Sequence, residues 1–568
     1  MDPLKKKNLT QDVLYCCLIL IFSILISLPL FKGQFIYSTD YAGTLMRLLS
    51  MQQSLGHGQW VVRWVPELYR GFGYPVFNFY PPLFYLLGTL MVNLGAGLVQ
   101  AINLSLFLVI LLSGLAMYLF ARELWGREGG LVCAVAYLFA PYHIMDLYLR
   151  CAAAETASFV FMPLILWSFY KLKQRPRKRY IAYCALFCSG LLLTHNGISL
   201  IFIPLVLGYI MVLDWPYRSY ENIRSLLQGL LAWGIGLGLA AFFWLPAFVE
   251  KKFVHVEFLS QGNLNFKENF VNFKELVSPV WNHDMPYFAG AQEFCRIGLV
   301  HGLMVLIVVL GFRKIVLQEP RLRAQILFFA AVVLGGIFLI LPCSLPIWEH
   351  IQVLQFLQFP FRFLTLVVLA GSVLAGGIIL LFGQEHRLKA CFVIVLVIFS
   401  TNFYYCHPRG TVKCNLKLVK VDPDRYLSEL CQQDGGEYIP IWVKEGPKKL
   451  PEFMPLQKLE PLTKGGQVID TEKVSPWHYR FTVLAQEGSI FCYKSFYFPG
   501  WVVKTEGREI RILKDNPYGL ITFQCPAGIH HVEIYFRTTP LHQAAQAISA
   551  FFLILLIGLL LNRKRPNC

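Results

Sequence analysis

The sequence is poor in charged residues. Of its 568 residues only 15% are Asp, Glu, Lys or Arg, whereas 56% are hydrophobic and the mean hydropathy is +0.52. A soluble domain carries about 25% charged residues, and surface-to-volume scaling limits how much apolar surface a soluble chain can bury. The composition therefore excludes a soluble fold, and also a disordered, coiled-coil, collagen-like or small disulfide-rich protein. It predicts that a lipid bilayer surrounds most of the chain.

Acidic residues are scarcer than basic ones. The chain has 34 Asp and Glu against 51 Lys and Arg, which gives a net charge of +17. In a soluble protein such an excess suggests a nucleic-acid partner. Here much of it lies in short loops between apolar runs, where basic residues orient a membrane protein. We therefore expect no nucleic-acid partner.

Signatures of metal binding and of internal repeats are missing. The sequence contains no CxxC or His-x-x-His spacing and no low-complexity tract, so no metal site is predicted. It has 15 cysteines, and those in apolar runs are predicted to act as small apolar side chains. An oxidising compartment would allow some cysteines of the C-terminal part to pair, in a connectivity that the sequence leaves open. These are Cys406, Cys414, Cys431, Cys492 and Cys525.

Apolar runs near the length that crosses a bilayer, about 20 residues, predict twelve transmembrane helices. The first is a retained span, because no small-x-small cleavage site follows it. The segment 82–97 is apolar but short, and we expect it to be re-entrant or interfacial. The spans are residues 13–31, 99–121, 129–146, 156–171, 180–194, 197–213, 224–247, 297–312, 323–341, 362–383, 388–404 and 543–561.

The loop charges agree with twelve spans. Residues 171–179 contain six basic residues and no acidic one. With twelve spans this cluster is cytoplasmic, whereas a further span at 82–97 would place it outside, against the positive-inside rule. Both termini are then cytoplasmic. Three long segments, which are expected to carry function, fall outside: 32–98, 248–296 and 405–542.

The last outside segment changes from apolar runs to short alternating ones. Hydrophobic and polar residues alternate with period 2, and turn-forming pairs such as Pro499-Gly500 separate the runs. This pattern is typical of an antiparallel β-sandwich. The predicted domains are a polytopic α-helical membrane domain (1–404), an extracytoplasmic β-sandwich (405–542), and a final span with a basic tail (543–568). The alternating runs are residues 479–483, 501–505, 509–513 and 531–536.

Asp40 lies about nine residues beyond the first span, near the outer interface. One interpretation is a helix N-cap, because an apolar-periodic run follows it. The other is a carboxylate held over a membrane-embedded cavity. Both interpretations remain open at this point.

The same loop continues with many aromatic, Gly and Pro residues between 60 and 82. An aromatic belt at the membrane interface would produce this composition. The alternative is a sugar-binding surface, in which rings stack on sugar faces while Glu67 and Arg70 hydrogen-bond hydroxyl groups.

Further polar residues interrupt apolar sequence, where a charged group costs several kcal/mol and needs a reason. Arg150 and Glu155 are either an ion pair or site residues, and His195 is either a turn residue or a ligand. Arg362 is either an interfacial Arg that extends to the headgroups or a clamp for a phosphate. All fall on the outer side of the twelve-span topology, which predicts a site there. The remaining candidates on that side are Glu250, His283, Asp284 and Gln358.

Several of these motifs resemble known membrane families. Asp40 in the first outside loop, with the turn 121–127, resembles the GT-C superfamily of multi-spanning glycosyltransferases. More closely, a series of motifs in the same order resembles a bacterial membrane family labelled "6-pyruvoyl-tetrahydropterin synthase-related", and the runs 496–501 and 526–530 resemble the outside domain of YfhO-like proteins. The ordered motifs are 67–75, 80–82, 149–150 with Glu155, 244–246 with Glu250, and 358–362.

The GT-C resemblance implies a fold, a donor and a catalytic residue. It implies a glycosyltransferase of the bacterial cytoplasmic membrane that uses a polyprenyl-phosphate-linked sugar. In this resemblance Asp40 occupies the place of the catalytic acidic residue. Several GT-C enzymes carry a paired acidic motif for a divalent metal, whereas Asp40 stands beside Thr39 and Tyr41. The resemblance therefore does not carry over a metal requirement, and a divalent metal stays open. The histidine set of a soluble pterin synthase is absent.

The expected chemistry is sugar transfer at the outer face. Asp40 would act as general base and Arg362 would hold the donor phosphate, with Arg150 as second cation. Single displacement would invert the anomeric centre. The acceptor is a glycan, a lipid or a protein. Two alternatives stay open: a flippase or transporter of lipid-linked saccharides, and a non-catalytic protein of cell-envelope assembly.

Overall fold

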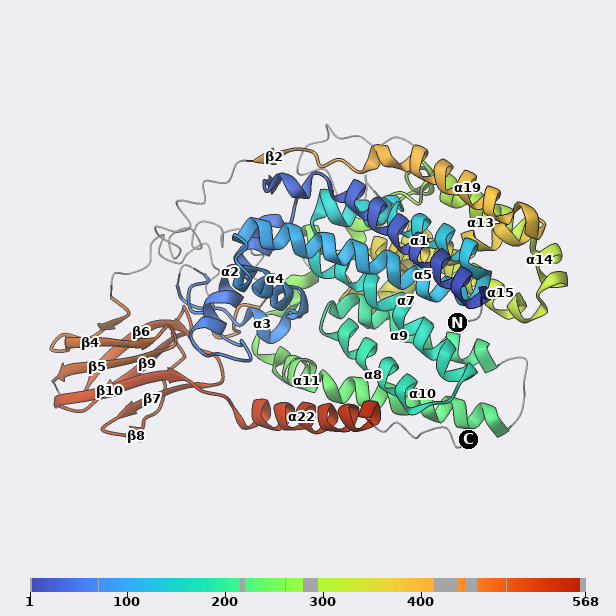
Figure 1. Ribbon diagram of the computed structural model, residues 1–568. Helices are drawn as coiled ribbons and strands as arrows, with labels where there is room; N and C mark the ends of the chain where they lie inside the picture. The colour runs from blue at the N-terminus through green and yellow to red at the C-terminus, as the bar shows by residue number, and fades with distance from the viewer. Residues whose placement is uncertain are drawn as a thin grey trace.

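The computed structural model describes residues 3–69, 71–214, 220–260, 262–278, 295–412, 438–444, 457–486 and 488–561. Packed helices make up most of the molecule, and a small β-domain lies at one end of them (Figure 1). The last helix, α22 (Pro540–Leu561), returns from the β-domain along the helical part.

The helices follow the apolar runs, and each of the twelve predicted spans coincides with helical structure. Two of these spans are bent pairs, α10 with α11 at 74° and α13 with α14 at 60°. The helices of this part are α1 (Pro3–Ser27), α5 (Leu98–Leu138), α7 (Ala153–Gln174), α8 (Lys178–Leu192), α9 (Asn196–Asp214), α10 (Tyr220–Leu239), α11 (Ala241–Glu250), α13 (Leu299–Leu310), α14 (Phe312–Gln318), α15 (Arg323–Ile340), α18 (Leu364–Ala375) and α19 (Arg387–Asn402).

Helix α5 is a hairpin of two spans rather than one rod. Gly126 has φ 78° and ψ −177°, which breaks the helix. A Cβ on Gly130 would lie 3.0 Å from the backbone nitrogen of Arg122, and one on Gly114 would lie 2.8 Å from Cδ1 of Leu138. Residues on the two sides of Gly126 therefore pack against each other in antiparallel order. The second arm ends at Leu138, earlier than the predicted residue 146.

The number of spans depends on this hairpin. Within the described residues, eight helices are long and apolar enough to cross a membrane, or ten if each bent pair is one span. That count takes α5 as a single helix and omits α8, which has 15 residues. Dividing α5 at Gly126 and including α8 gives the twelve predicted segments.

Helix α4 (Leu83–Asn93) occupies the segment predicted not to span. Its 11 residues are about 16 Å long at 1.5 Å per residue, about half the thickness of the hydrocarbon core. It packs against α2 (Tyr41–Gly56), which follows Asp40. The short helices α2, α3 (Val76–Phe79) and α4 lie at the end of the bundle that carries the β-domain (Figure 1).

The β-domain is an antiparallel sandwich, which confirms the predicted fold class. One sheet has the order β4-β5-β10-β7-β8 and the other has the order β3-β6-β9. The predicted strand 509–513 is shorter than expected, because Leu513 turns away to bridge Thr522 of the other sheet. The strands are β3 (Leu459–Pro461), β4 (Gln467–Ser475), β5 (His478–Ala485), β6 (Ser489–Phe496), β7 (Trp501–Thr505), β8 (Arg508–Glu509), β9 (Leu520–Cys525) and β10 (Gly528–Phe536).

The predicted cysteine pairing is not formed among the described cysteines of this part. Cys406, Cys492 and Cys525 are all free. Cys492 lies opposite Thr522 and Cys525 lies opposite Ser489, so the two cysteines are three positions apart along the β6–β9 ladder. Cys414 and Cys431 lie outside the described residues.

The aromatic loop, residues 60–80, is the surface on which the β-domain rests; we call it the aromatic platform. Trp64 is fully buried and stacks on Phe498 and Phe536, with ring centroids 6.0 and 5.7 Å away. Phe72 stacks on Phe496, whose backbone N–H donates to the Phe72 carbonyl oxygen (2.7 Å). These rings hold two domains together and are not available to stack on a sugar.

A two-stranded sheet makes a second connection. Strand β1 (Phe35–Ile36), in the loop after α1, pairs with β2 (Thr411–Val412), in the chain that follows α19. The Asp40 loop is thus fixed to the segment that leaves the last helix before the β-domain.

Candidate functional site

The site is built on a short π-helix, Met145–Arg150, between α5 and α7. It ends at Cys151, which has a left-handed backbone (φ 52°), a conformation that costs a non-glycine residue about 1–3 kcal/mol. π-helical turns are rare in proteins overall, but those that occur are often found at functional sites. This turn and the start of α7 bring Asp146, Arg150 and Glu155 together.

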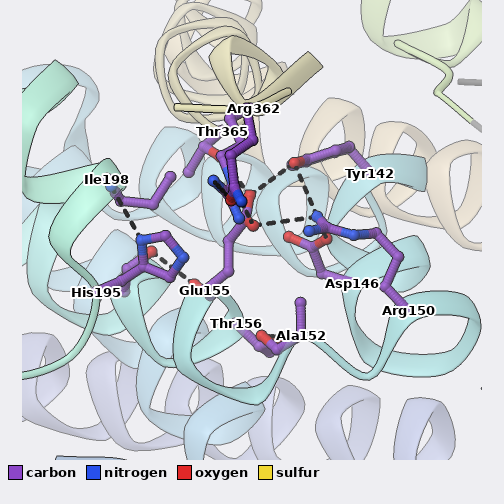
Figure 2. Close-up of polar contacts among 12 residues, drawn as sticks. Tyr142, Asp146, Arg150, Ala152, Glu155, Thr156, His195, Ile198, Arg362 and Thr365 are labelled. Atoms are coloured by element: carbon purple, nitrogen blue, oxygen red, sulfur yellow. Dashed lines mark hydrogen bonds and ion pairs between the residues drawn. The ribbon is translucent and has the colours of Figure 1, made fainter. Parts of the chain in front are cut away.

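Arg150 joins two carboxylates in the interior. Its Nη1 donates to Asp146 Oδ1 (2.7 Å), Glu155 Oε2 (3.1 Å) and the Tyr142 hydroxyl oxygen (3.3 Å). The Tyr142 hydroxyl in turn donates to Glu155 Oε1 (2.6 Å). Figure 2 shows the four side chains pointing toward one another.

Arg362 approaches Glu155 from the 3₁₀ turn Pro360–Phe363, directly before α18. Its Nε lies 3.4 Å from Glu155 Oε2, and its Nη1 donates to the Leu357 carbonyl (2.6 Å) and to Gln358 Oε1 (3.3 Å). Gln358 has φ 64°, a second strained backbone beside the site. Thr365 donates to Glu155 Oε1 (3.4 Å). Glu155 thus contacts residues of two segments that are far apart in the sequence, 142–150 and 362–365 (Figure 2).

We call Tyr142, Asp146, Arg150, Glu155 and Arg362 the arginine–carboxylate cluster. It contains two carboxyl and two guanidinium groups, so its formal charges balance when all four are ionised. Balance matters because removing one partner of a buried pair leaves an uncompensated charge. The Arg362 side chain is 12% exposed, against 1% for Glu155, so Arg362 is the member of this ion pair that solvent reaches.

Asp40 is fixed beside the cluster by its backbone. Its N–H donates to the carbonyl oxygen of Arg150 (2.8 Å), and the Thr39 hydroxyl donates to the same oxygen (3.0 Å). Asp40 occupies the N-cap position of α2, yet its side chain makes no capping hydrogen bond. The N-cap interpretation is therefore right for the backbone and wrong for the carboxylate, which is exposed.

The protein groups around Asp40 change the pKa of its side chain. Desolvation by the protein around it is the largest influence on its pKa and raises it, while the positive charges of Arg150, Arg47 and Arg362 oppose this. Glu155 raises it slightly further. An exposed carboxylate that protein nevertheless desolvates is accessible to a ligand and partly shielded from bulk water.

Arg47 was not predicted from the sequence. Its guanidinium lies 4.3 Å from the centre of the Tyr80 ring, and its Nη1 lies 3.5 Å from where a Cβ on Gly43 would be. The side chain therefore folds back along α2 toward Asp40, the usual direction for a long side chain on a helix. Its signal in the sequence is a single cation on the otherwise apolar face of α2, two helical turns after Asp40.

His195 lies at the start of α9 and faces the cluster (Figure 2). Its Nδ1 accepts a hydrogen bond from the Ile198 N–H (3.1 Å), so it acts as the cap of α9. Burial, reinforced by the positive charge of Arg362, lowers the pKa of His195 to about 3. The imidazole is therefore neutral, and with Nδ1 accepting, its proton is on Nε2. The turn-residue and site interpretations both describe this residue.

Other sequence candidates lie elsewhere. Glu250 accepts from Asn78 Nδ2 (2.7 Å) and bonds His542 Nε2 (3.1 Å), which joins α11, the platform and α22. Glu67 is half-buried in the platform. The structure thus gathers Arg150, Glu155, His195, Gln358 and Arg362 beside Asp40, and places Glu250 and Glu67 apart. Arg70, His283 and Asp284 lie outside the described residues.

The acidic groups are arranged for ion pairing rather than for metal binding. Asp146 and Glu155 are bonded to guanidinium groups. Within the ranges that the structure describes, no group of three or more His, Cys, Asp or Glu residues has the arrangement of a metal site.

Several solved structures are similar in part to this chain. Arabinofuranosyltransferase AftD from Mycobacteria has a TM-score of 0.48 at 16% identity and covers 72% of this chain and 28% of its own. ArnT from Cupriavidus metallidurans, bound to undecaprenyl phosphate, has a TM-score of 0.41 at 15% identity, with 74% and 75% covered. The Archaeoglobus fulgidus oligosaccharyltransferase has a TM-score of 0.38 at 15% identity, with 74% and 58% covered.

A curated relative and a family model match the sequence. An uncharacterized protein of Lactococcus lactis subsp. cremoris (strain MG1363) is 25% identical over 303 residues, 52% of this chain and 46% of the relative. The chain thus spans about half the length of that relative. The model of the 6-pyruvoyl-tetrahydropterin synthase related domain, described as a membrane protein, matches residues 77–406. This range includes the whole arginine–carboxylate cluster, and the chain belongs to this family of membrane proteins.

Proposed function

We propose that the protein is an integral membrane glycosyltransferase. It moves a sugar from a polyprenyl-phosphate donor to an acceptor hydroxyl on the face of the membrane that carries the β-domain. In this proposal that face is extracytoplasmic, the membrane is the bacterial cytoplasmic membrane, and the product belongs to the cell envelope.

One observation carries the proposal: an exposed acidic residue without a side-chain capping role is fixed beside the buried arginine–carboxylate cluster of a membrane protein. Asp40 is held by its backbone on the carbonyl oxygen of Arg150, so its position relative to the cluster is set by hydrogen bonds. Sugar transfer from a lipid phosphate needs these two elements. A base must remove a proton from the acceptor, and cations must stabilise the leaving phosphate.

Asp40 is the residue best suited to act as base. Glu155 is saturated by Arg150, Arg362, Tyr142 and Thr365. Asp40 has its side chain free of the helix cap, and desolvation raises its pKa. A raised pKa makes the carboxylate a stronger base.

Arg362 is the residue best suited to bind the phosphate. Two oxygens fix its Nη1, and among the described residues no hydrogen bond uses its Nη2. Glu155 and the Phe359 ring, 4.9 Å from the guanidinium carbon, set its orientation. A guanidinium held in this way loses little conformational freedom when it binds a phosphate oxygen.

The proposed step is a single displacement. The acceptor oxygen, losing its proton to Asp40, forms a bond with the anomeric carbon. The bond between that carbon and the phosphate oxygen breaks, and the electron pair leaves on the phosphate, where Arg362 and the neighbouring charge of Arg150 stabilise it. Attack from the face opposite the phosphate inverts the configuration at that carbon.

The test is Asp40→Asn in the full-length protein. The amide has the same shape but no basicity, so sugar transfer should fall about 10²–10⁴-fold while the protein still folds and binds donor. The readouts are lipid analysis of cells that contain the variant, in which one polyprenyl-phosphate sugar should accumulate, and thermal unfolding of the purified protein.

Glu67→Gln is the matched control. Glu67 is an acidic residue of the same segment as Asp40, residues 32–98, but it lies in the aromatic platform. The variant should leave transfer unchanged. Full transfer by Asp40→Asn would remove Asp40 from the mechanism. Unaltered cell-envelope glycans and polyprenyl-phosphate sugars in Asp40→Asn and Arg362→Ala cells would argue against a glycosyltransferase altogether.

A further inference from the structure

The β-domain contains a cleft that no step of the proposed reaction uses. It lies between the start of β3, with the two residues that precede it, and the first half of β4, and Tyr479 of β5 also lines it. Its volume is about 430 Å³, within the range of small-molecule sites, roughly 300–1,000 Å³.

A β-bulge shapes one wall of this cleft. In the β4–β5 ladder Val468 pairs with Val483 and Asp470 pairs with Thr482, which leaves Ile469 as an extra residue. In a regular strand successive side chains point to opposite faces. Here four consecutive residues, Val468 to Thr471, line the same cleft. Bulges re-aim side chains in this way and are frequent next to binding sites.

Within the described residues, the two sheets of the sandwich leave this region uncovered. Strand β4 is an edge strand of the five-stranded sheet, whereas the facing sheet has three strands and ends in β3, which is only three residues long. Most of β4 is exposed, including Asp470 and Thr471. Leu459 and Tyr479, in contrast, are buried. The cleft therefore has polar walls that solvent reaches and a buried apolar side.

This combination suits a polyhydroxylated ligand. A carboxylate (Asp470), a hydroxyl (Thr471) and an amide (Gln457) accept and donate hydrogen bonds at neighbouring positions, as pairs of sugar hydroxyls require. Val468 and Tyr479 offer apolar surface to the C–H faces of a ring. A purely apolar chain would leave Asp470 desolvated without a partner, which is costly.

We propose that this cleft binds an oligosaccharide, and, resting on the proposed function, that this oligosaccharide is part of the acceptor. The cleft is connected to the aromatic platform, and the end of the platform lies near the Asp40 site. Lys458 lines the cleft and its Nζ donates to the carbonyl oxygen of Gly71 in the platform (2.6 Å). The same platform ends at Tyr80, on which Arg47 stacks. A glycan in the cleft would thus be bound to the β-domain, which rests on the aromatic platform next to the Asp40 site.

The experiment measures binding of chitotriose, maltotriose and cellotriose to the full-length protein in detergent, by saturation-transfer NMR and calorimetry. At least one should bind saturably. Asp470→Ala removes hydrogen bonds to a charged group, which should weaken binding about tenfold or more. Thr471→Trp should block the cleft. Glu472→Gln is the matched control. Glu472 follows Thr471 in β4, does not line the cleft and pairs with Arg480. The variant should bind the trisaccharide as tightly as the unaltered protein does.

The outcomes separate this proposal from the proposed function. Asp40→Asn should bind the oligosaccharide with unchanged affinity, because the cleft lies in another domain. If Asp40→Asn keeps full transferase activity while Asp470→Ala loses binding, the cleft is supported and the catalytic proposal fails. The cleft proposal is overturned if none of the three trisaccharides binds saturably, or if Asp470→Ala and Thr471→Trp both bind as tightly as Glu472→Gln.

Discussion

Arg47 is the residue that the site adds to its sequence-based description, and its effect on Asp40 gives a pH prediction. Asp40 must be deprotonated to accept a proton. Desolvation raises its pKa, and Arg150, Arg47 and Arg362 oppose that rise. Replacing Arg47 by Gln removes one opposing charge, so the pKa of Asp40 should rise further. The acid limb of the kcat/KM profile should then move to higher pH, with a greater loss of rate at pH 5 than at pH 8.

Arg47→Lys is the control, because it keeps the charge and loses the planar stacking on Tyr80. Its acid limb should stay close to that of the unaltered protein. The charged groups that face Asp40 are otherwise the same in both variants: Arg150, Arg362 and Glu155. An acid limb that Arg47→Gln does not move would mean that Arg47 has no influence on the ionisation of the base.

A second prediction concerns the stability of the arginine–carboxylate cluster. Glu155→Gln keeps the size of the side chain and removes the charge that faces Arg150 and Arg362. Breaking a buried pair on one side costs about 3–5 kcal/mol, so the melting temperature in detergent should fall markedly. Ser158→Ala, one turn further along α7, loses a hydroxyl that bonds only the Glu155 carbonyl and should change stability by about 1 kcal/mol or less. Equal melting temperatures for the two variants would contradict the assigned charge balance.

At the scale of elements, the α5 hairpin depends on close contact between its arms. A Cβ on Gly130 would lie 2.9 to 3.1 Å from Cβ, N and Cα of Arg122, two of which are backbone atoms that cannot move independently. Overpacking of this kind costs about 1–3 kcal/mol, so Gly130→Ala should lower the melting temperature.

Gly234→Ala in α10 is the matched control. Nothing lies within 4 Å of a Cβ at that position, and Ala is favoured over Gly in a helix by about 1 kcal/mol. Its melting temperature should be equal to or above that of the unaltered protein. The hairpin interpretation of α5 is wrong if Gly130→Ala is as harmless as Gly234→Ala.

At the scale of the whole molecule, the platform joins the domains through a few large rings. Trp64 is fully buried among Phe498, Trp501 and Phe536. Trp64→Ala should cost about 3–5 kcal/mol and loosen the β-domain, which limited proteolysis of the purified protein would detect. Trp60 belongs to the same loop but is 89% exposed, so Trp60→Ala should leave the cleavage pattern unchanged. Faster cleavage of both variants, or of neither, would contradict the role given to Trp64.

Local patterns predicted much of this architecture. Apolar runs predicted the twelve long helical segments but not the short helices between them, such as α3, and alternation from Tyr479 to Phe536 predicted the sandwich. Charged residues in apolar sequence predicted Arg150, Glu155 and Arg362, because such groups need partners. Asp40 was found by its place in the first outside loop.

The contacts that were missed join residues far apart in the sequence or depend on irregular backbone. The π-helix that aligns Asp146 with Arg150 has no periodic signature, so residue 146 was taken as the end of a span. The burial of the platform rings depends on partners in the β-domain, which no local pattern connects with residues 60–80. Strand β6 is buried along most of its length, so it lacks the alternation that identifies a half-buried strand.

The stacking of Phe72 on Phe496 also affects the order in which the protein folds during its synthesis. About 420 residues separate the two rings, so at about 5–20 residues per second the ribosome needs roughly 20–80 s to supply the second after the first. Hydrophobic collapse takes only microseconds, so the newly made platform must be sheltered throughout this interval. The membrane–water interface, where aromatic side chains accumulate, can keep these rings away from water during this interval. The rings would lie there during biosynthesis and leave the interface only when the finished β-domain arrives.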